Sequence, residues 1–326
     1  MSKRKKNRKE KSKLRIWAEY IPFRIFLEIV RLIPTKVAYA LSSFIFRMMF
    51  LFFDRKHSKR SVEHLMHAGV ASTKEEAVEI ARRAYHNFSM LLVEIFKMDQ
   101  IIDLDSVTIT GSESAIKEAC IHGGDNINLI IVTAHYGNWE LAGSAWAHNF
   151  GIPMVSIMRK FGNPLIGECI LKSRQSDIHQ CVYKEGGIKG LLKALRGGKT
   201  IAILADQHAS TREGGIETKF FGHPCRTHTS PAILHLKTGI PILPLVTRRK
   251  PNGNGFEFVV SDLIKYEPTG DKQADIHTVT QMYTTALEEL ILEAPDQWLW
   301  AHRRWLNINR KGYKPTTSSE PEASVS

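Results

Sequence analysis

The chain has 326 residues, of which 43% are hydrophobic and 24% are charged, so it can bury one large hydrophobic core. Nine of its first 15 residues are Lys or Arg, so the formal net charge of +12 belongs largely to a tail and is not evidence for a nucleic-acid-binding fold. The cysteines stand apart without C-x-x-C spacing, so neither a disulfide framework nor a zinc ribbon is indicated and a reducing, cytosolic environment is favoured.

The N-terminus carries two features of membrane association. Residues 1–15 form a basic tail that we expect to be attracted to anionic lipid headgroups, by about 1 kcal/mol per basic residue near the surface. A solvated arm that binds any polyanion loosely is the alternative. Residues 16–33 mix aromatic, aliphatic and charged side chains, as in a helix that lies in a membrane interface, and Pro34 ends this helix.

Residues 37–53 are almost wholly apolar, but this stretch is at the lower limit of length for a membrane span. Arg47 lies within it, and Lys and Arg flank it on both sides. Because positive charge favours the cytoplasmic side, both ends are expected on that side. We therefore predict that residues 16–60 anchor the chain as an interfacial or re-entrant helical segment, with a single span as the alternative.

The rest of the chain alternates between helical and strand patterns. Ser72 and Glu75 form a capping box ahead of apolar residues at helical spacing between Ala77 and Ile95. Short β-branched runs predict strands at 128–133, 153–158, 200–205, 241–247 and 256–260. Helices are expected at 139–150, 188–196, 230–238 and 276–293. This order predicts an α/β fold over residues 61–308, a mixed, largely parallel sheet flanked by helices. Residues 309–326 have the composition of a disordered tail.

The strand at 128–133 opens into a loop that carries His135 and then Glu140. Ligand sites in open α/β sheets gather at such carboxyl ends of strands. We expect Glu140 to lie in the first turn of a helix that Asn138 caps, and its carboxylate to hold one imidazole nitrogen. The other nitrogen is then free to take a proton from an incoming hydroxyl. The alternative is a histidine held by a nearby carboxylate for structural reasons alone.

The sequence has neither a G-x-S-x-G elbow nor a cysteine beside a histidine. The activated hydroxyl is therefore expected to attack a thioester directly, with donors near the Gly137-Asn138 turn stabilising the oxyanion.

Two other strand ends carry polar residues. Arg159 follows the strand at 153–158, and its planar guanidinium suits a phosphate or carboxylate, an ordinary surface arginine being the alternative. Asp206 and Gln207 follow the strand at 200–205. Asp206 is interpreted either as a functional residue or as a helix cap or turn residue.

Metal and nucleic-acid sites are not supported by the spacing of the residues that would make them. Four histidines lack any zinc-binding spacing: His135, His208, His223 and His228. Trp298, Trp300 and Trp305 occur among arginines near the end of the apolar region, where they suit an anionic lipid headgroup or interface as well as stacked bases. We predict no metal and no nucleic acid.

Six ordered blocks together resemble the lipid A biosynthesis acyltransferases, within the wider lysophospholipid acyltransferase superfamily. These blocks are Ala134–Glu140; Arg159 with Asn163-Pro164; Ala205–Gln207; Phe220–Gly222; Thr238–Pro244 with Arg248–Lys250; and Ala294–Trp298 with His302–Arg304. The resemblance covers about residues 16 to 308. Glu140 stands where the wider superfamily commonly has Asp, and Glu matches the lipid A branch.

The resemblance implies a general base at His135 with Glu140 as its partner, and an acceptor site lined by Arg159 and Asp206. We place Gln207 and Asn138 among the substrate-binding residues as well. An acyl carrier protein would supply the acyl group as a phosphopantetheine thioester, with no other cofactor. The acceptor would be a hydroxyl of a lipid A precursor, in lipopolysaccharide biosynthesis at the cytoplasmic face of the inner membrane. The alternatives are another glycolipid or lysophospholipid acceptor, or a membrane lipid-binding protein without catalysis.

Overall fold

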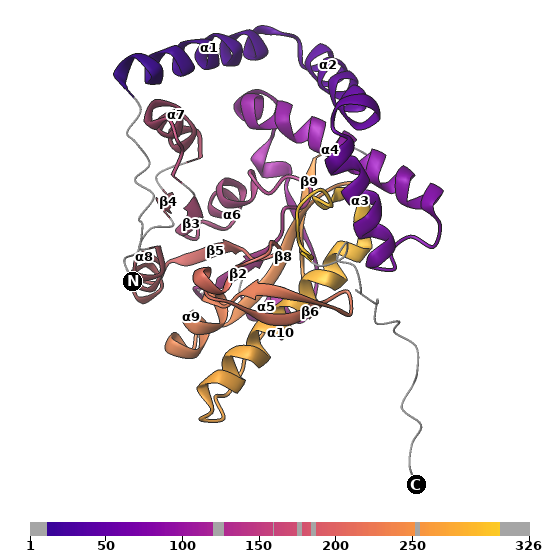
Figure 1. Ribbon diagram of the computed structural model, residues 1–326. Helices are drawn as coiled ribbons and strands as arrows, with labels where there is room; N and C mark the ends of the chain where they lie inside the picture. Colours follow the sequence, from indigo (N-terminus) through magenta and orange to yellow (C-terminus); the bar gives the residue numbers. More distant parts are fainter. Residues whose placement is uncertain are drawn as a thin grey trace, which may run out of the picture.

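The computed structural model describes residues 12–119, 127–158, 160–174, 178–183, 187–251 and 255–306. Its centre is a seven-stranded sheet with helices on both faces, and the N-terminal helices lie together along one side (Figure 1). The predicted mixed, largely parallel sheet flanked by helices is therefore confirmed. The tails predicted at 1–15 and 309–326 lie wholly or largely outside the described residues.

The sheet has the strand order β1-β9-β8-β2-β5-β3-β4. Its strands are β1 (Thr108–Gly111), β2 (Ile130–Thr133), β3 (Met154–Met158), β4 (His179–Tyr183), β5 (Thr200–Leu204), β8 (Ile242–Arg249) and β9 (Phe256–Val260). Strands β8, β2, β5, β3 and β4 run parallel, β9 is antiparallel to β8, and β1 is parallel to β9. The carboxyl ends of the five parallel strands therefore meet at one edge of the sheet.

Strand β2 is buried along its whole length because helices cover both of its faces. Ile130 and Val132 belong to the core cluster shared with α8 (Gly187–Arg196), α9 (Ser230–Thr238) and α10 (Lys272–Glu293). Leu129 and Ile131 belong to a second cluster, shared with α5 (Glu113–Glu118) and α6 (Ala142–Phe150). Successive side chains of β2 point to opposite faces of the sheet, so they pack into both clusters. The carboxyl end of β2 therefore lies between the two clusters.

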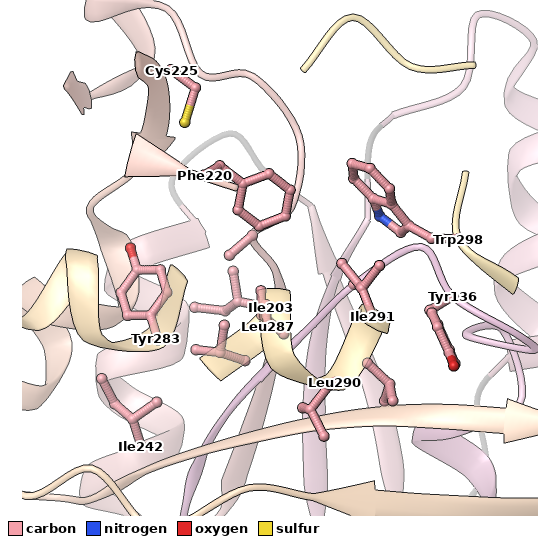
Figure 2. Packing of buried hydrophobic residues seen from close by; sticks show 14 of the residues in the cluster. Tyr136, Ile203, Phe220, Cys225, Ile242, Tyr283, Leu287, Leu290, Ile291 and Trp298 are labelled. Carbon is pink, nitrogen blue, oxygen red and sulfur yellow. The ribbon is translucent and has the colours of Figure 1, made fainter. Parts of the chain in front are cut away.

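The C-terminal tryptophans close the first cluster. The rings of Phe220 and Trp298 lie 5.5 Å apart, and Figure 2 shows them close to Leu287 and Ile291 of α10. Phe220 ends the first strand of a separate hairpin, β6 (Gly215–Phe220) and β7 (His223–His228), which the sequence patterns did not predict. This hairpin packs against α10, and Trp298 contacts its Phe220.

The helices predicted at 188–196, 230–238 and 276–293 correspond to α8, α9 and α10. Helix α10 begins at Lys272 because the Asp271 carboxylate accepts from the N–H groups of Gln273 and Ala274. Helix α6 begins at Ala142 and not at the predicted 139. Strands β1 and β4 and helix α7 (Pro164–Arg174) were not predicted.

Helix α4 (Lys74–Ile101) is longer than expected, and its cap lies one residue later. The Thr73 side chain, not that of Ser72, is the N-cap and accepts from the N–H of Glu76. The Glu76 carboxylate accepts in turn from the N–H of Ser72. Both readings of the sequence fit the same S/T-x-x-E pattern, so spacing alone did not distinguish them.

The N-terminal segment consists of α1 (Lys13–Leu32), α2 (Thr35–Met48), a π-helical turn (Met49–Phe53) and α3 (Arg55–His67). Pro34 separates α1 from α2 as predicted, and every residue of α1 keeps some exposure. Residues 35–53 form a helix long and apolar enough to cross a membrane by length and composition, with 17% of its apolar window buried. The predicted boundary at residue 60 falls within α3, which continues without a break from the predicted N-terminal segment to residue 67.

Candidate active site

His135 and Asp206 meet at the carboxyl edge of the sheet. His135 lies two residues beyond β2 and Asp206 two residues beyond β5, and these neighbouring strands pair Thr133 with Leu204. The imidazole Nδ1 lies 2.8 Å from Asp206 Oδ1, and the backbone N–H of His135 donates to Oδ2 over 3.0 Å. Both carboxylate oxygens of Asp206 therefore bind the same residue, which fixes the position and the orientation of the ring.

The environment of Asp206 keeps its carboxylate ionised. The residue is 2% exposed, and burial alone would raise its pKa. The neighbouring His135 and hydrogen bonds from His135 and from the Trp298 indole outweigh burial and lower the pKa of Asp206 to about 2. An ionised carboxylate only accepts, so the neutral form of His135 carries its proton on Nδ1 and has Nε2 as its acceptor nitrogen.

Gln207 lies beside the same imidazole. Its amide nitrogen is 3.2 Å from each ring nitrogen of His135. The backbone carbonyl of Gln207 accepts from Arg304, which is 1% exposed and also donates to the Arg226 carbonyl and to Thr227. The predicted substrate-binding residue Gln207 is therefore held at the reacting nitrogen by a buried arginine.

Glu140, the predicted partner of His135, has other contacts. Its carboxylate accepts from the Trp139 indole over 3.1 Å and pairs with Arg174 of α7 over 2.5 Å. The carboxylate that holds Nδ1 of His135 belongs to Asp206, which corrects the expected hydrogen bond. The physical reason is local: the chain turns through 139–141 before α6 begins, so Glu140 is directed to α7. Trp139 contacts both Glu140 and His135: its indole donates to the Glu140 carboxylate, and its ring lies edge-on to the imidazole at 5.1 Å.

Asn138 was expected to cap the helix, but it caps the turn before it: its side-chain oxygen accepts from the N–H of Leu141 over 3.0 Å, and Leu141 is the N-cap residue of α6. The amide nitrogen of Asn138 donates to Glu94 of α4, and the residue is fully buried. Asn138 was predicted to bind substrate, but both polar ends of its buried side chain are bound within the protein, to Leu141 and to Glu94. The expected oxyanion donors are also engaged, since the N–H groups of Gly137 and Asn138 donate to the carbonyls of Gln297 and Thr247.

Asp206 was expected to line the acceptor site, and its burial places it behind His135 instead. Arg159 lies outside the described residues, so its predicted contact with the acceptor stays a prediction. The patterns did not single out two further contributors, Arg174 and the buried Glu94. Trp298 was noted for its aromatic surface, whereas its bond to Asp206 is a polar one. Among the residues described, no group of three or more His, Cys, Asp or Glu side chains is placed to hold a metal ion.

A cavity of about 180 Å³ is lined in part by Trp139, the side chain that packs against the imidazole of His135. Its lining is largely apolar and includes Phe46, Met49, Tyr85, Phe88, Trp139 and Trp300. Trp139 forms part of this wall and packs on His135, and Leu299, another lining residue, donates its N–H to the carbonyl of His135. Residues 46–61, α4 and the turn at 137–139 thus enclose one largely apolar space, and Trp139 separates this space from the imidazole of His135.

Residues 4–307 match the sequence model of the bacterial lipid A biosynthesis acyltransferases. The chain belongs to this family. The family resemblance predicted from the six blocks is thereby confirmed.

Three relatives show how broad the similarity is. The chain is 26% identical over 179 residues to a lipid A biosynthesis lauroyltransferase and 22% identical over 182 residues to a lipid A biosynthesis palmitoleoyltransferase, both of Escherichia coli K12. It is 23% identical over 184 residues to a phosphatidylinositol mannoside acyltransferase of Mycobacterium tuberculosis. These matches cover 54–55% of this chain and 55–56% of the relatives, so the chain matches about half the length of each.

Proposed function

We propose that this family member is an O-acyltransferase that moves a fatty acyl group from an acyl carrier protein thioester to a hydroxyl of a lipid A precursor. The observation that carries the proposal is the His135–Asp206 pair, with Nδ1 held at 2.8 Å from the carboxylate and Trp139 packed between the imidazole and an apolar cavity. The reaction belongs to lipopolysaccharide biosynthesis and takes place at the cytoplasmic face of the inner membrane.

His135 acts as the general base through Nε2. It takes the proton of the acceptor hydroxyl as the hydroxyl oxygen attacks the thioester carbonyl. Collapse of the tetrahedral intermediate breaks the C–S bond, and the departing thiolate takes the proton back from the imidazolium. The product is an ester, and the carrier leaves as a free thiol. Asp206 stabilises the imidazolium without taking its proton, as the buried carboxylate does in serine proteases.

Gln207 is the donor that we assign to the oxyanion. Its amide nitrogen lies 3.2 Å from Nε2 of His135, so the amide is close to the thioester carbonyl that is attacked by the hydroxyl deprotonated at Nε2, and it can donate to the developing oxyanion. The turn N–H groups predicted for this task already donate to Gln297 and Thr247. Arg304, which holds the Gln207 backbone, preserves this geometry during the reaction.

The cavity beside Trp139 is the space that we assign to the acyl chain. Its aromatic and aliphatic lining stabilises a hydrocarbon chain by about 0.8 kcal/mol for each buried CH₂ group. Phe46 and Met49 come from the helical segment that is apolar enough to enter a membrane, so the cavity lies where a lipid chain would arrive. The membrane-anchoring role of residues 16–60 is part of the same proposal.

Relatives at 22–26% identity carry names that differ in the acceptor or pathway. Two of them are named for lipid A biosynthesis and one for phosphatidylinositol mannoside. The phosphate contact predicted for Arg159 favours an acceptor that carries phosphate. A phosphorylated glycolipid is therefore the favoured class, with a lysophospholipid as the alternative.

The test offers one acyl carrier thioester to detergent-solubilised enzyme with three acceptors in parallel: a tetra-acylated lipid A precursor, a phosphatidylinositol mannoside and a lysophospholipid. Mass spectrometry then identifies which acceptor gains one acyl group. We expect the lipid A precursor to be acylated at least tenfold faster than the others. A faster reaction with either of the other two reassigns the acceptor. Binding of lipids without any product identifies a lipid-binding protein.

A further inference from the structure

Glu94 of α4 is buried at a point where four parts of the chain meet. It is 1% exposed, and Arg249 of β8 binds both of its oxygens, at 2.6 and 3.0 Å. The amide of Asn138 donates to Oε2 over 2.9 Å, and the hydroxyl of Tyr39 on α2 donates to Oε1 over 3.3 Å. The carboxylate therefore accepts bonds from the sheet, the catalytic turn and the anchoring segment.

The hydrogen bond from Asn138 to Glu94 affects the imidazole of His135 through Trp139, the residue that follows Asn138. Asn138 precedes Trp139, whose ring packs edge-on against His135 at 5.1 Å. With its oxygen on Leu141 and its nitrogen on Glu94, the Asn138 side chain has both polar ends fixed. A shift of Asn138 would move Trp139, the side chain shared by the imidazole and the apolar cavity.

The ion pair between Glu94 and Arg249 holds the Glu94 carboxylate in one orientation. A buried carboxylate that accepts two bonds from one guanidinium keeps a fixed orientation, because any rotation breaks a charge-assisted bond in a low-dielectric interior. Arg249 is fixed at its backbone too: its N–H donates to Gln297 and its carbonyl accepts from the same side chain. Through Glu94 and Arg249, the 136–141 turn is thus connected both to β8 of the sheet and to Gln297, which precedes Trp298.

We infer that Glu94 is a positioning residue for the proposed acyl transfer: it fixes the 136–141 turn that sets Trp139 against His135, and it connects this turn to α2. The inference rests on the proposed function for its kinetic readout. It follows that seating α2 against α4 is part of forming a competent site. Loss of the Tyr39 bond should weaken catalysis in the same direction as loss of the carboxylate, and by less, because that bond is the longest of the four.

The first test is Glu94→Gln, which keeps the shape and removes the charge, compared with Glu257→Gln as the matched control. Glu257 pairs over 2.9 Å with Arg248, the neighbour of Arg249 on β8, and its side-chain partners within the described part of the chain, Arg248 and Thr110, lie outside the 136–141 turn. We expect kcat of Glu94→Gln to fall about 10- to 100-fold with KM for the donor within about threefold, as for a displaced reacting group. The Glu257 variant should keep kcat within about twofold.

Glu94→Gln leaves Arg249 buried without its partner and can fail to fold for that reason alone. The double variant Glu94→Leu/Arg249→Met removes both charges and keeps an apolar filling, which is often neutral for stability. It should show the same loss of kcat at an unchanged Tm. A kcat within twofold of wild type in this folded variant, or in folded Glu94→Gln, overturns the inference. An unchanged kcat of Tyr39→Phe in lipid vesicles overturns the connection to α2.

A second readout does not depend on activity. The Nδ1 proton of His135 is shared with Asp206 and gives a downfield proton resonance, which we expect to shift or broaden in Glu94→Gln and to stay unchanged in Glu257→Gln. An unshifted resonance in Glu94→Gln contradicts the positioning role. If wild-type enzyme acylates no lipid while Glu94→Gln still shifts this resonance, the proposed function fails and the positioning role stands.

Discussion

His135 and Asp206 are 71 residues apart in the chain, yet Nδ1 of one lies 2.8 Å from Oδ1 of the other. Each follows the last residue of its strand by two positions, and those last residues, Thr133 and Leu204, are register partners in adjacent parallel strands. The pairing register of β2 and β5 thus places the imidazole opposite the carboxylate. The site is a property of the sheet more than of the local motif.

This relationship predicts different outcomes for the two candidate carboxylates. Asp206→Asn presents an amide donor to Nδ1, which favours the tautomer with the proton on Nε2, and kcat should fall about 10²- to 10⁴-fold. Glu140→Gln disturbs only the bonds to Trp139 and Arg174, so a loss of about tenfold or less is expected. Steady-state kinetics of both purified variants decide the matter. A larger loss in Glu140→Gln than in Asp206→Asn would restore Glu140 as the partner of His135.

The low pKa of Asp206 also predicts how stability depends on pH. Its folded pKa of about 2 lies below the ordinary value of 3.8, so the native state binds the proton less tightly than the unfolded chain. This contribution, about 2 kcal/mol, is fully present above pH 4 and is lost as the pH falls through 2. Unfolding by denaturant at pH 7, 4 and 2.5 should show it in wild type and not in Asp206→Asn. Parallel pH profiles of the two proteins would contradict the assignment.

Position 137 requires glycine, both for its backbone conformation and for the space around it. Gly137 has φ +55°, and a Cβ at this position would lie 2.0 Å from the carbonyl oxygen of Thr247. Gly137→Ala should therefore destabilise the fold by about 2–4 kcal/mol. Gly151→Ala is the control, because Gly151 has a similar φ of +62° with nothing within 4 Å of the added methyl group, and it should cost about 1–2 kcal/mol. Thermal unfolding of the two variants measures the difference, and equal Tm values would show that the close approach is not rigid.

The exposed apolar side chains of the anchoring segment predict membrane attachment. Phe44 and Phe52 are 61% and 57% exposed. Since burying a phenylalanine in an apolar medium contributes about 1.5–3 kcal/mol, Phe44→Gln/Phe52→Gln should lower partition into lipid vesicles at least about tenfold. Leu292→Gln on α10, where the leucine is 51% exposed, should leave it unchanged. Vesicle flotation of the double variant at the wild-type level would contradict the predicted anchor.

Much of the architecture was predictable because burial on both faces leaves a direct signature. The continuous apolar run at 130–133 and its β-branched counterparts marked the central parallel strands. Strand β4 reads His179-Gln-Cys-Val-Tyr183, a half-exposed pattern on the edge of the sheet, and was missed for that reason. Helix α6 was placed too early because Asn138 caps a turn and not the helix itself.

The sequence identified several residues of the site, but it did not predict all of their roles. Asp206 and Gln207 were identified from their place after a strand, whereas the partner of His135 was sought nearby in sequence, at Glu140. Strand order decides which strand ends are neighbours, and strand order cannot be read from spacing. Glu94 had no signal at all, since it is one acid within a long amphipathic helix and its partners come from three distant segments.

The central claim is that Nε2 of His135 takes the proton from a lipid hydroxyl during direct transfer from a carrier thioester. Its most direct test is a single-turnover reaction of wild-type enzyme and folded His135→Ala with an acyl carrier thioester and a tetra-acylated lipid A precursor, followed by mass spectrometry of the lipid. The account predicts one added acyl group with wild type and a rate lower by about 10³-fold or more with His135→Ala at an unchanged Tm. Product formed by the variant at a rate near that of wild type would contradict it.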